Sequence, residues 1–110
     1  MLVVEDDPGA RGALRYVFSR AGHHVTLAAT LAEALLELRR HEPDLVVLDL
    51  MLPDGDGEVV LQSLRASGSN VRVAVTTGVM EPQRLQRVQA LNPTCVLLKP
   101  INVNDLLRCL

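Results

Sequence analysis

The sequence has few aromatic residues, little net charge and no long apolar run, and each shortage argues against a class of function. Its 110 residues include one tyrosine, one phenylalanine and no tryptophan, which leaves almost nothing to stack on nucleic-acid bases. The formal net charge of −2 provides no basic field, so this domain alone is not expected to bind nucleic acid. No apolar run approaches the ~20 residues that cross a membrane, so neither a membrane span nor a secretory leader is expected.

Cysteine is also scarce. The two cysteines, Cys95 and Cys109, do not have the spacing of a metal site, and Cys95 lies within an apolar run. Both are predicted to be free thiols, which indicates a reducing, cytoplasmic location. The three histidines, at positions 23, 24 and 41, are predicted to be ordinary surface residues.

What the sequence does contain is a regular alternation of short apolar segments and segments with helical periodicity. The expected strands are residues 2–4, 24–28, 45–48, 71–76 and 95–98. Strands that alternate with helices form a parallel sheet with right-handed crossovers and helices on both faces. The helix expected over residues 57–67 should pack Val59, Val60 and Leu64 inward. With 48% hydrophobic residues, a chain of this length has one core and is expected to be one domain.

Polar residues follow four of the expected strands. Glu5 and Asp6 come after the first strand, Asp49 after the third, Thr77 after the fourth and Lys99 after the fifth. The carboxyl ends of parallel strands meet at one edge of the sheet, where ligands of open α/β folds bind. Three carboxylates there suit a hard divalent cation such as Mg²⁺. Together with an ammonium and a hydroxyl group, they are the components of phosphoryl transfer to an aspartate.

Four motifs occur in register with these strand ends. Thr77 lies 28 residues after Asp49, and Lys99 lies 50 residues after it. In this order and spacing, the chain resembles the receiver domains of bacterial two-component response regulators along essentially its whole length. The motifs that carry the resemblance are Glu5-Asp6-Asp7, Asp49-Leu50-Met51-Leu52-Pro53-Asp54-Gly55-Asp56-Gly57, Thr77-Gly78 and Lys99-Pro100.

This resemblance implies an α/β fold of the flavodoxin-like, doubly wound (βα)5 type. It is a three-layer sandwich whose five-stranded parallel sheet has the order 2-1-3-4-5, with its crevice between strands one and three. Residues 1–110 would be the receiver domain, and any effector or kinase domain would lie outside them. By the same resemblance, Lys99–Pro100 would be a cis peptide.

The resemblance also implies a function. Asp49 would accept a phosphoryl group from the phosphohistidine of a sensor histidine kinase or phosphotransfer protein, in a reaction that depends on Mg²⁺. Asp6, Asp49 and the backbone carbonyl of Met51 would bind the metal, and Glu5 would orient its waters. The other two site residues, Thr77 and Lys99, would hold the phosphoryl oxygens.

Phosphorylation would then shift the face built from the fourth helix, the fifth strand and the fifth helix. Through this face the domain would control an output domain or partner protein, or form a homodimer. It would be a signalling domain and not an enzyme, apart from promoting its own phosphorylation and slow dephosphorylation.

One position departs from the usual pattern of the family, and two others bear on the lifetime of the phosphoryl group. Val96 stands three residues before the lysine, where the family usually carries the Tyr or Phe whose burial accompanies the switch, so a smaller rearrangement is expected. Met51 and Val79 lie two residues after the acceptor and the threonine. Neither side chain can orient a hydrolytic water, which predicts a long-lived phosphoryl group.

Two alternatives stay open at this point. One is a degenerate receiver that serves only as a protein-interaction scaffold. The other is a Mg²⁺-dependent aspartyl-phosphate hydrolase, although such enzymes usually carry a second acid at the position of Met51.

Overall fold

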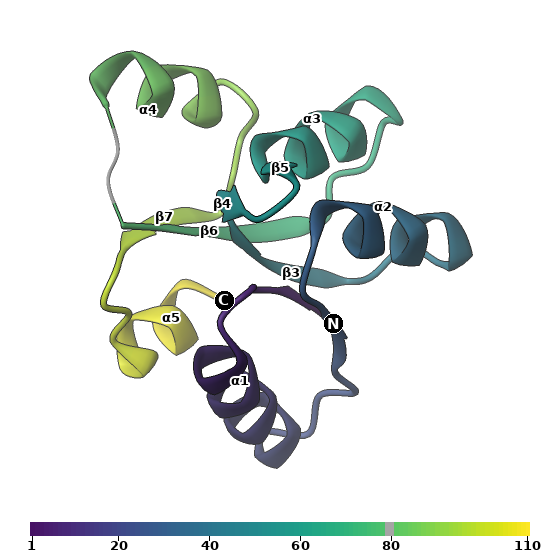
Figure 1. Cartoon of the computed structure of the whole chain (residues 1–110), viewed down its shortest axis with the longest axis vertical. Helices are drawn as coiled ribbons and strands as arrows, with labels where there is room; N and C mark the ends of the chain where they lie inside the picture. Colours follow the sequence, from purple (N-terminus) through teal and green to yellow (C-terminus); the bar gives the residue numbers. More distant parts are fainter. Residues whose placement is uncertain (79–80) are drawn as a thin grey trace.

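The computed structural model describes residues 1–78 and 81–110, and its strands and helices alternate along the chain (Figure 1). Five strands form one parallel sheet in the order β2-β1-β3-β6-β7, which corresponds to the expected order 2-1-3-4-5. The elements are β1 (Leu2–Val4), α1 (Pro8–Arg20), β2 (Thr26–Ala28), α2 (Leu31–Arg40), β3 (Leu45–Asp49), β4 (Met51–Leu52), β5 (Gly55–Asp56), α3 (Glu58–Ala66), β6 (Arg72–Thr77), α4 (Pro82–Gln89), β7 (Cys95–Leu98) and α5 (Val103–Cys109).

The sheet is covered on both faces, which confirms the three-layer arrangement. Helices α1 and α5 lie on one face, and α2, α3 and α4 lie on the other (Figure 1). Alternate residues of each strand point to opposite faces, so β3 sends Val46 and Leu48 toward α2, α3 and α4 and sends Val47 toward α1 and α5. Since both faces are buried, every residue of β3 is apolar except the last, Asp49.

Helices α1, α2 and α5 begin at residues whose side chains cap them. The Asp7 carboxylate accepts a hydrogen bond from the Ala10 N–H at the start of α1, and the Thr30 hydroxyl accepts one from the Glu33 N–H at the start of α2. Among residues 1–78 and 81–110, no helix is long and apolar enough to cross a membrane.

The bounds of three strands and the inward face of one helix differ from the prediction. The third strand extends to Asp49, and the fourth runs from Arg72 to Thr77. The second strand begins at Thr26, because its partner β1 begins at Leu2 and pairs with it there. In α3 the inward residues are Val60, Leu61 and Leu64, whereas Val59 is 39% exposed, because the position before Val60 lies about 100° around the helix from it. The two-residue strands β4 and β5 form an antiparallel ribbon that the sequence did not predict.

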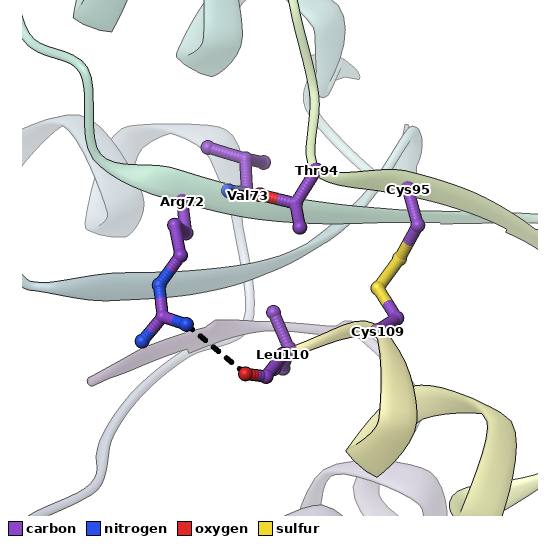
Figure 2. The surroundings of a disulfide bond; sticks show 6 residues. All are labelled: Arg72, Val73, Thr94, Cys95, Cys109 and Leu110. Carbon is purple, nitrogen blue, oxygen red and sulfur yellow. Dashed lines mark hydrogen bonds between the residues drawn. A yellow bond between two sulfur atoms is a disulfide. The ribbon is translucent and has the colours of Figure 1, made fainter.

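The prediction of free thiols is also wrong. Cys95, the first residue of β7, and Cys109, the last residue of α5, form a disulfide (Figure 2). Their Cα atoms are 6.2 Å apart, within the usual range for this bond. Nearby, the Arg72 side chain donates a hydrogen bond of 3.0 Å to the Leu110 carbonyl (Figure 2). The sequence argument for a reducing location therefore loses its support.

Candidate functional site

The polar residues expected at the strand ends meet at the carboxyl edge of the sheet. Asp49 ends the central strand β3, and Glu5 and Asp6 follow its neighbour β1. On the other side of β3, Thr77 ends β6, and Lys99 follows β7. The Lys99 N–H donates a hydrogen bond of 2.7 Å to the Thr77 carbonyl, so the two last strands stay paired up to the site.

Lys99 connects the two buried acids. Its Nζ atom lies 2.9 Å from Glu5 Oε1 and 2.9 Å from Asp49 Oδ2. Glu5 is 2% exposed and Asp49 is 1% exposed, whereas Lys99 reaches solvent with about a third of its side chain. Charge-assisted hydrogen bonds of this kind offset part of the cost of keeping two carboxylates away from water.

The charges of this group shift two pKa values. Burial raises the pKa of Glu5 above its ordinary value of 4.5, and the neighbouring Asp49 raises it further, while Lys99 acts in the opposite direction without reversing the shift. Burial lowers the pKa of Lys99, but its hydrogen bonds to Glu5 and Asp49 outweigh that effect and leave the pKa raised. Because the two carboxylates of Glu5 and Asp49 share the single ammonium group of Lys99, this edge of the sheet carries an excess of negative charge.

The same carboxylates fit a divalent cation. Glu5, Asp6 and Asp49 each offer one oxygen, and these oxygens lie within 4.8 Å of one another. Glu5 and Asp49 are buried, whereas Asp6 faces solvent. An all-oxygen donor set with an open side is typical of Mg²⁺ sites, in which the metal keeps several waters. Burial and the neighbouring Asp49 raise the pKa of Glu5, and a bound cation would relieve the repulsion between these two carboxylates.

The chain after Asp49 folds back against the end of β3. The Met51 N–H donates a hydrogen bond of 3.0 Å to Asp49 Oδ1, while the Met51 side chain is largely exposed. At Gly57 the chain returns so closely that a Cβ atom there would lie 2.1 Å from the Asp49 carbonyl oxygen. Glycine is therefore required at this position. Val79, the other residue expected to limit hydrolysis, lies outside the described residues.

A cavity of about 370 Å³ adjoins the site between α1 and the segment after β7. Glu5 and Lys99 line one part of it, and the remaining walls are largely apolar, with contributions from Ala10, Ala13, Leu14, Ile101 and Val103. Asp49 is not among the residues that line this cavity.

Sequence reasoning missed several residues that support the site. The Arg11 guanidinium donates hydrogen bonds of 3.1 Å to the backbone carbonyls of Glu5 and Asp6. Asp56 accepts from the Glu58 N–H and forms an ion pair of 2.6 Å with Arg84 of α4. Asp54 accepts two hydrogen bonds from α2. These partners are distant along the chain or lie on its backbone, and no spacing in the sequence reveals them. By contrast, the cis peptide Lys99–Pro100, which the resemblance implied, is present.

Comparisons with known proteins agree with this geometry. The family model described as "Response regulator receiver domain" matches residues 1–110. The chain is 30% identical to Sporulation initiation phosphotransferase F of Bacillus subtilis, over 96% of this chain and 86% of the relative. It is 33% identical to the KDP operon transcriptional regulatory protein KdpE of Escherichia coli, again over 96% of this chain but over only 47% of the relative.

A solved response regulator structure is also similar to this chain. It is a response regulator protein from Burkholderia pseudomallei with a phosphorylated aspartic acid, a calcium ion and citrate, and it superposes with a TM-score of 0.88 at 25% identity. The match covers 99% of this chain and 64% of that one.

Proposed function

Because this chain belongs to the response regulator receiver domain family, we propose that it accepts a phosphoryl group on Asp49 and uses it to switch a signalling output. The observation that carries the proposal is the contact of the buried Asp49 with Lys99, whose ammonium lies 2.9 Å from the acceptor carboxylate. A buried carboxylate held by one cation and facing two further acids is poorly explained by stability alone.

The proposed step exchanges one bond to phosphorus for another. A carboxylate oxygen of Asp49 forms a bond to phosphorus, the phosphorus–nitrogen bond of the donor's phosphohistidine breaks, and the electron pair returns to the imidazole. Lys99, which contacts the Asp49 carboxylate, would then bind one of the phosphoryl oxygens, and the Thr77 hydroxyl on the adjacent strand would donate to another of them. The fixed position of these groups is the domain's main contribution to the reaction.

Mg²⁺ is the cation that we assign to the acidic cluster. Asp6, Asp49 and the Met51 carbonyl would bind it, and Glu5 would orient its waters. When bound, the ion supplies positive charge to the phosphoryl oxygens. The calcium ion and the phosphorylated aspartic acid reported together in the Burkholderia pseudomallei structure support this assignment.

The partners follow from the family. Response regulators interact with histidine kinases and with output domains, and we propose that a sensor histidine kinase or a phosphotransfer protein is the donor here. The face of α4, β7 and α5 would transmit the signal by contacting an output domain, a partner protein or a second copy of the domain. Val96, partly buried in β7, replaces the usual ring, so we expect a smaller rearrangement, confined to the segment after Thr77 and the start of α4. A cytoplasmic location is proposed from the family alone.

The test is phosphorylation by a small-molecule donor such as acetyl phosphate in the presence of Mg²⁺, followed by intact-mass analysis. Asp49→Asn should abolish the added phosphoryl group, because the amide is close in shape but is not a nucleophile. Asp44→Asn is the matched control, since Asp44 is an exposed aspartate that immediately precedes β3, at the opposite end of the strand from Asp49. It should label like the parent.

Other results would favour other functions. Labelling of Asp49→Asn would place the acceptor elsewhere. A parent protein that folds but takes no phosphoryl group from any donor would indicate an interaction scaffold, and release of phosphate from small phosphoesters would indicate a hydrolase.

A further inference from the structure

The ribbon after the acceptor is attached to a helix that is distant in sequence. Strands β4 and β5 begin two residues after Asp49, and Met51 pairs with Asp56 across the ribbon. The turn between the strands carries Asp54. One oxygen of its carboxylate accepts a hydrogen bond of 2.7 Å from the Leu31 N–H, and the other accepts one of 3.0 Å from the Ala32 N–H.

These two donors are the first two residues of α2, which a helix leaves without internal partners. Thr30 does not use them, because its hydroxyl accepts from the Glu33 N–H at 3.1 Å. Hydrogen bonds from Ala32 and Leu31 hold the pKa of Asp54 below its ordinary value, so the carboxylate is ionised throughout the neutral range. The contact is therefore charge-assisted and is strengthened by the helix dipole.

The ribbon is in close contact with its neighbours on both sides. At Gly55 an added Cβ atom would lie 2.8 Å from the Leu31 Cδ2 atom, so the turn is pressed against the start of α2. On the other side, Asp56 holds Arg84 of α4 at 2.6 Å. Met51, which opens the ribbon, donates its N–H to the Asp49 carboxylate. If the turn moved, the Met51 main chain and its hydrogen bond to the Asp49 carboxylate would move with it.

We propose that Asp54 is a positioning residue for the phosphoryl-accepting site. It ties the turn of the β4–β5 ribbon to α2 and thereby fixes the Met51 main chain, whose N–H holds Asp49 and whose carbonyl belongs to the assigned metal site. The inference rests on the function proposed above. Without the tie, the turn of the ribbon loses its charged contact with α2, the Met51 main chain is less firmly fixed, and divalent-cation affinity and the rate of phosphorylation both fall.

The alternative is that Asp54 only caps α2. The chain offers a matched control for this, because Thr30→Ala removes another cap of the same helix and leaves the ribbon untouched. Asp54→Ala removes both the cap and the tie. Asp54→Asn keeps one oxygen for one N–H and places an amide group against the other, so it removes half of the tie with little change in volume.

The experiment compares the parent with these three variants. Mn²⁺ binding, followed by electron paramagnetic resonance with Mg²⁺ as competitor, gives the affinity, and intact-mass time courses with acetyl phosphate at saturating Mg²⁺ give the rate. We expect Thr30→Ala to match the parent in both measurements. Asp54→Ala should bind the cation about tenfold more weakly, the scale seen when groups that orient metal ligands are removed, and should label more slowly. Asp54→Asn should fall between them.

The outcomes separate this inference from the function on which it rests. If the parent labels on Asp49 while Asp54→Ala and Thr30→Ala have the same affinity and rate as each other, Asp54 is only a cap and the inference is wrong. If the parent neither binds Mn²⁺ nor labels, the proposed function fails as well. Circular dichroism identifies any variant that does not fold. If Asp54→Ala is such a variant, Asp54→Asn decides, and parent-like values for it overturn the inference.

Discussion

At the scale of single residues, the site combines two buried acids with one lysine that they share. Glu5 and Asp49 both contact the Lys99 ammonium, and burial keeps the pKa of Glu5 raised in spite of it. The domain therefore holds a proton at Glu5 more tightly when folded than when unfolded. This edge of the sheet is arranged for further positive charge and not for maximum stability.

The first prediction concerns pH and Lys99. Since Glu5 has a raised pKa in the folded state, the free energy of unfolding should fall as pH rises from about 4.5 through that raised pKa. The raised pKa of Lys99 acts only in the alkaline range. Lys99→Ala removes the cation that lowers the Glu5 pKa, so the fall should extend to higher pH. At neutral pH the free energy of unfolding of Lys99→Ala should be about 1–2 kcal/mol below that of the parent. This is less than for a fully buried ion pair, because Lys99 reaches solvent.

Urea unfolding at several pH values between about 5 and 8 measures this effect. Adding Glu5→Gln to the Lys99→Ala variant removes one of the two repelling charges and should restore most of the lost stability. A loss that is equal at both ends of the pH range would show that Glu5 and Lys99 are not linked as described.

The sequence identified the residues at the strand ends but not those that hold them. Glu5, Asp49 and Lys99 were predictable because each follows an apolar strand, and parallel strands end at one edge. The partner of Asp54 was not, because it is a pair of backbone N–H groups at the start of α2. Its position depends on the path of two loops, which no pattern of side chains encodes.

At the scale of elements, β7 and α5 are joined twice. The segment that contains Lys99 connects them at the carboxyl edge of the sheet, and the Cys95–Cys109 disulfide connects the start of β7 to the end of α5. The sequence could not predict this bond, because the cysteines are fourteen residues apart and the pairing depends on how α5 returns across the sheet. Cys95 in an apolar run was equally compatible with a buried thiol.

The second prediction concerns the covalent loop that the Cys95–Cys109 disulfide closes. Reduction breaks the disulfide, opens the loop and increases the conformational entropy of the unfolded chain. For a loop of this length, the free energy of unfolding should fall by about 3 kcal/mol. Urea unfolding with and without a reductant measures the change, after alkylation and mass analysis have confirmed the oxidised state.

The matched control is the double variant Cys95→Ser, Cys109→Ser, which should be as stable as the reduced parent and should not respond to reductant. An oxidised parent whose unfolding midpoint is unchanged by reduction would contradict the stabilising role of the bond.

At the scale of the whole molecule, the polar site and the disulfide lie at opposite ends of the strands. The acids, Thr77 and Lys99 lie at its carboxyl edge, whereas the disulfide begins at the first residue of β7, at the opposite end of that strand. The architecture itself was predictable, since five apolar segments followed by amphipathic helices have few ways to form a parallel sheet. The ribbon of β4 and β5 was not, because two-residue strands produce no detectable periodicity.

The third prediction concerns the response of the whole fold to Mg²⁺. A cation that binds only the folded state stabilises it by mass action, by about 2.7 kcal/mol at a hundredfold excess over the dissociation constant. Thermal unfolding should therefore shift upward with Mg²⁺. Asp6→Asn, which changes an exposed member of the cluster, should remove most of the shift. Sodium chloride at matched ionic strength is the control, and an equal shift with both salts would contradict a specific site.

Gly57 brings the start of α3 against the end of β3. Its Cα occupies a place where a Cβ would lie 2.1 Å from the Asp49 carbonyl oxygen and 2.9 Å from the Leu50 Cα, and α3 begins at the next residue. No side chain separates the Gly57 main chain from the Asp49 carbonyl oxygen, and closely packed atoms leave little room to approach further. A shift of the Asp49 main chain toward Gly57 would therefore displace the start of α3 as well, whereas rotation of the Asp49 side chain about its single bonds would not require that helix to move.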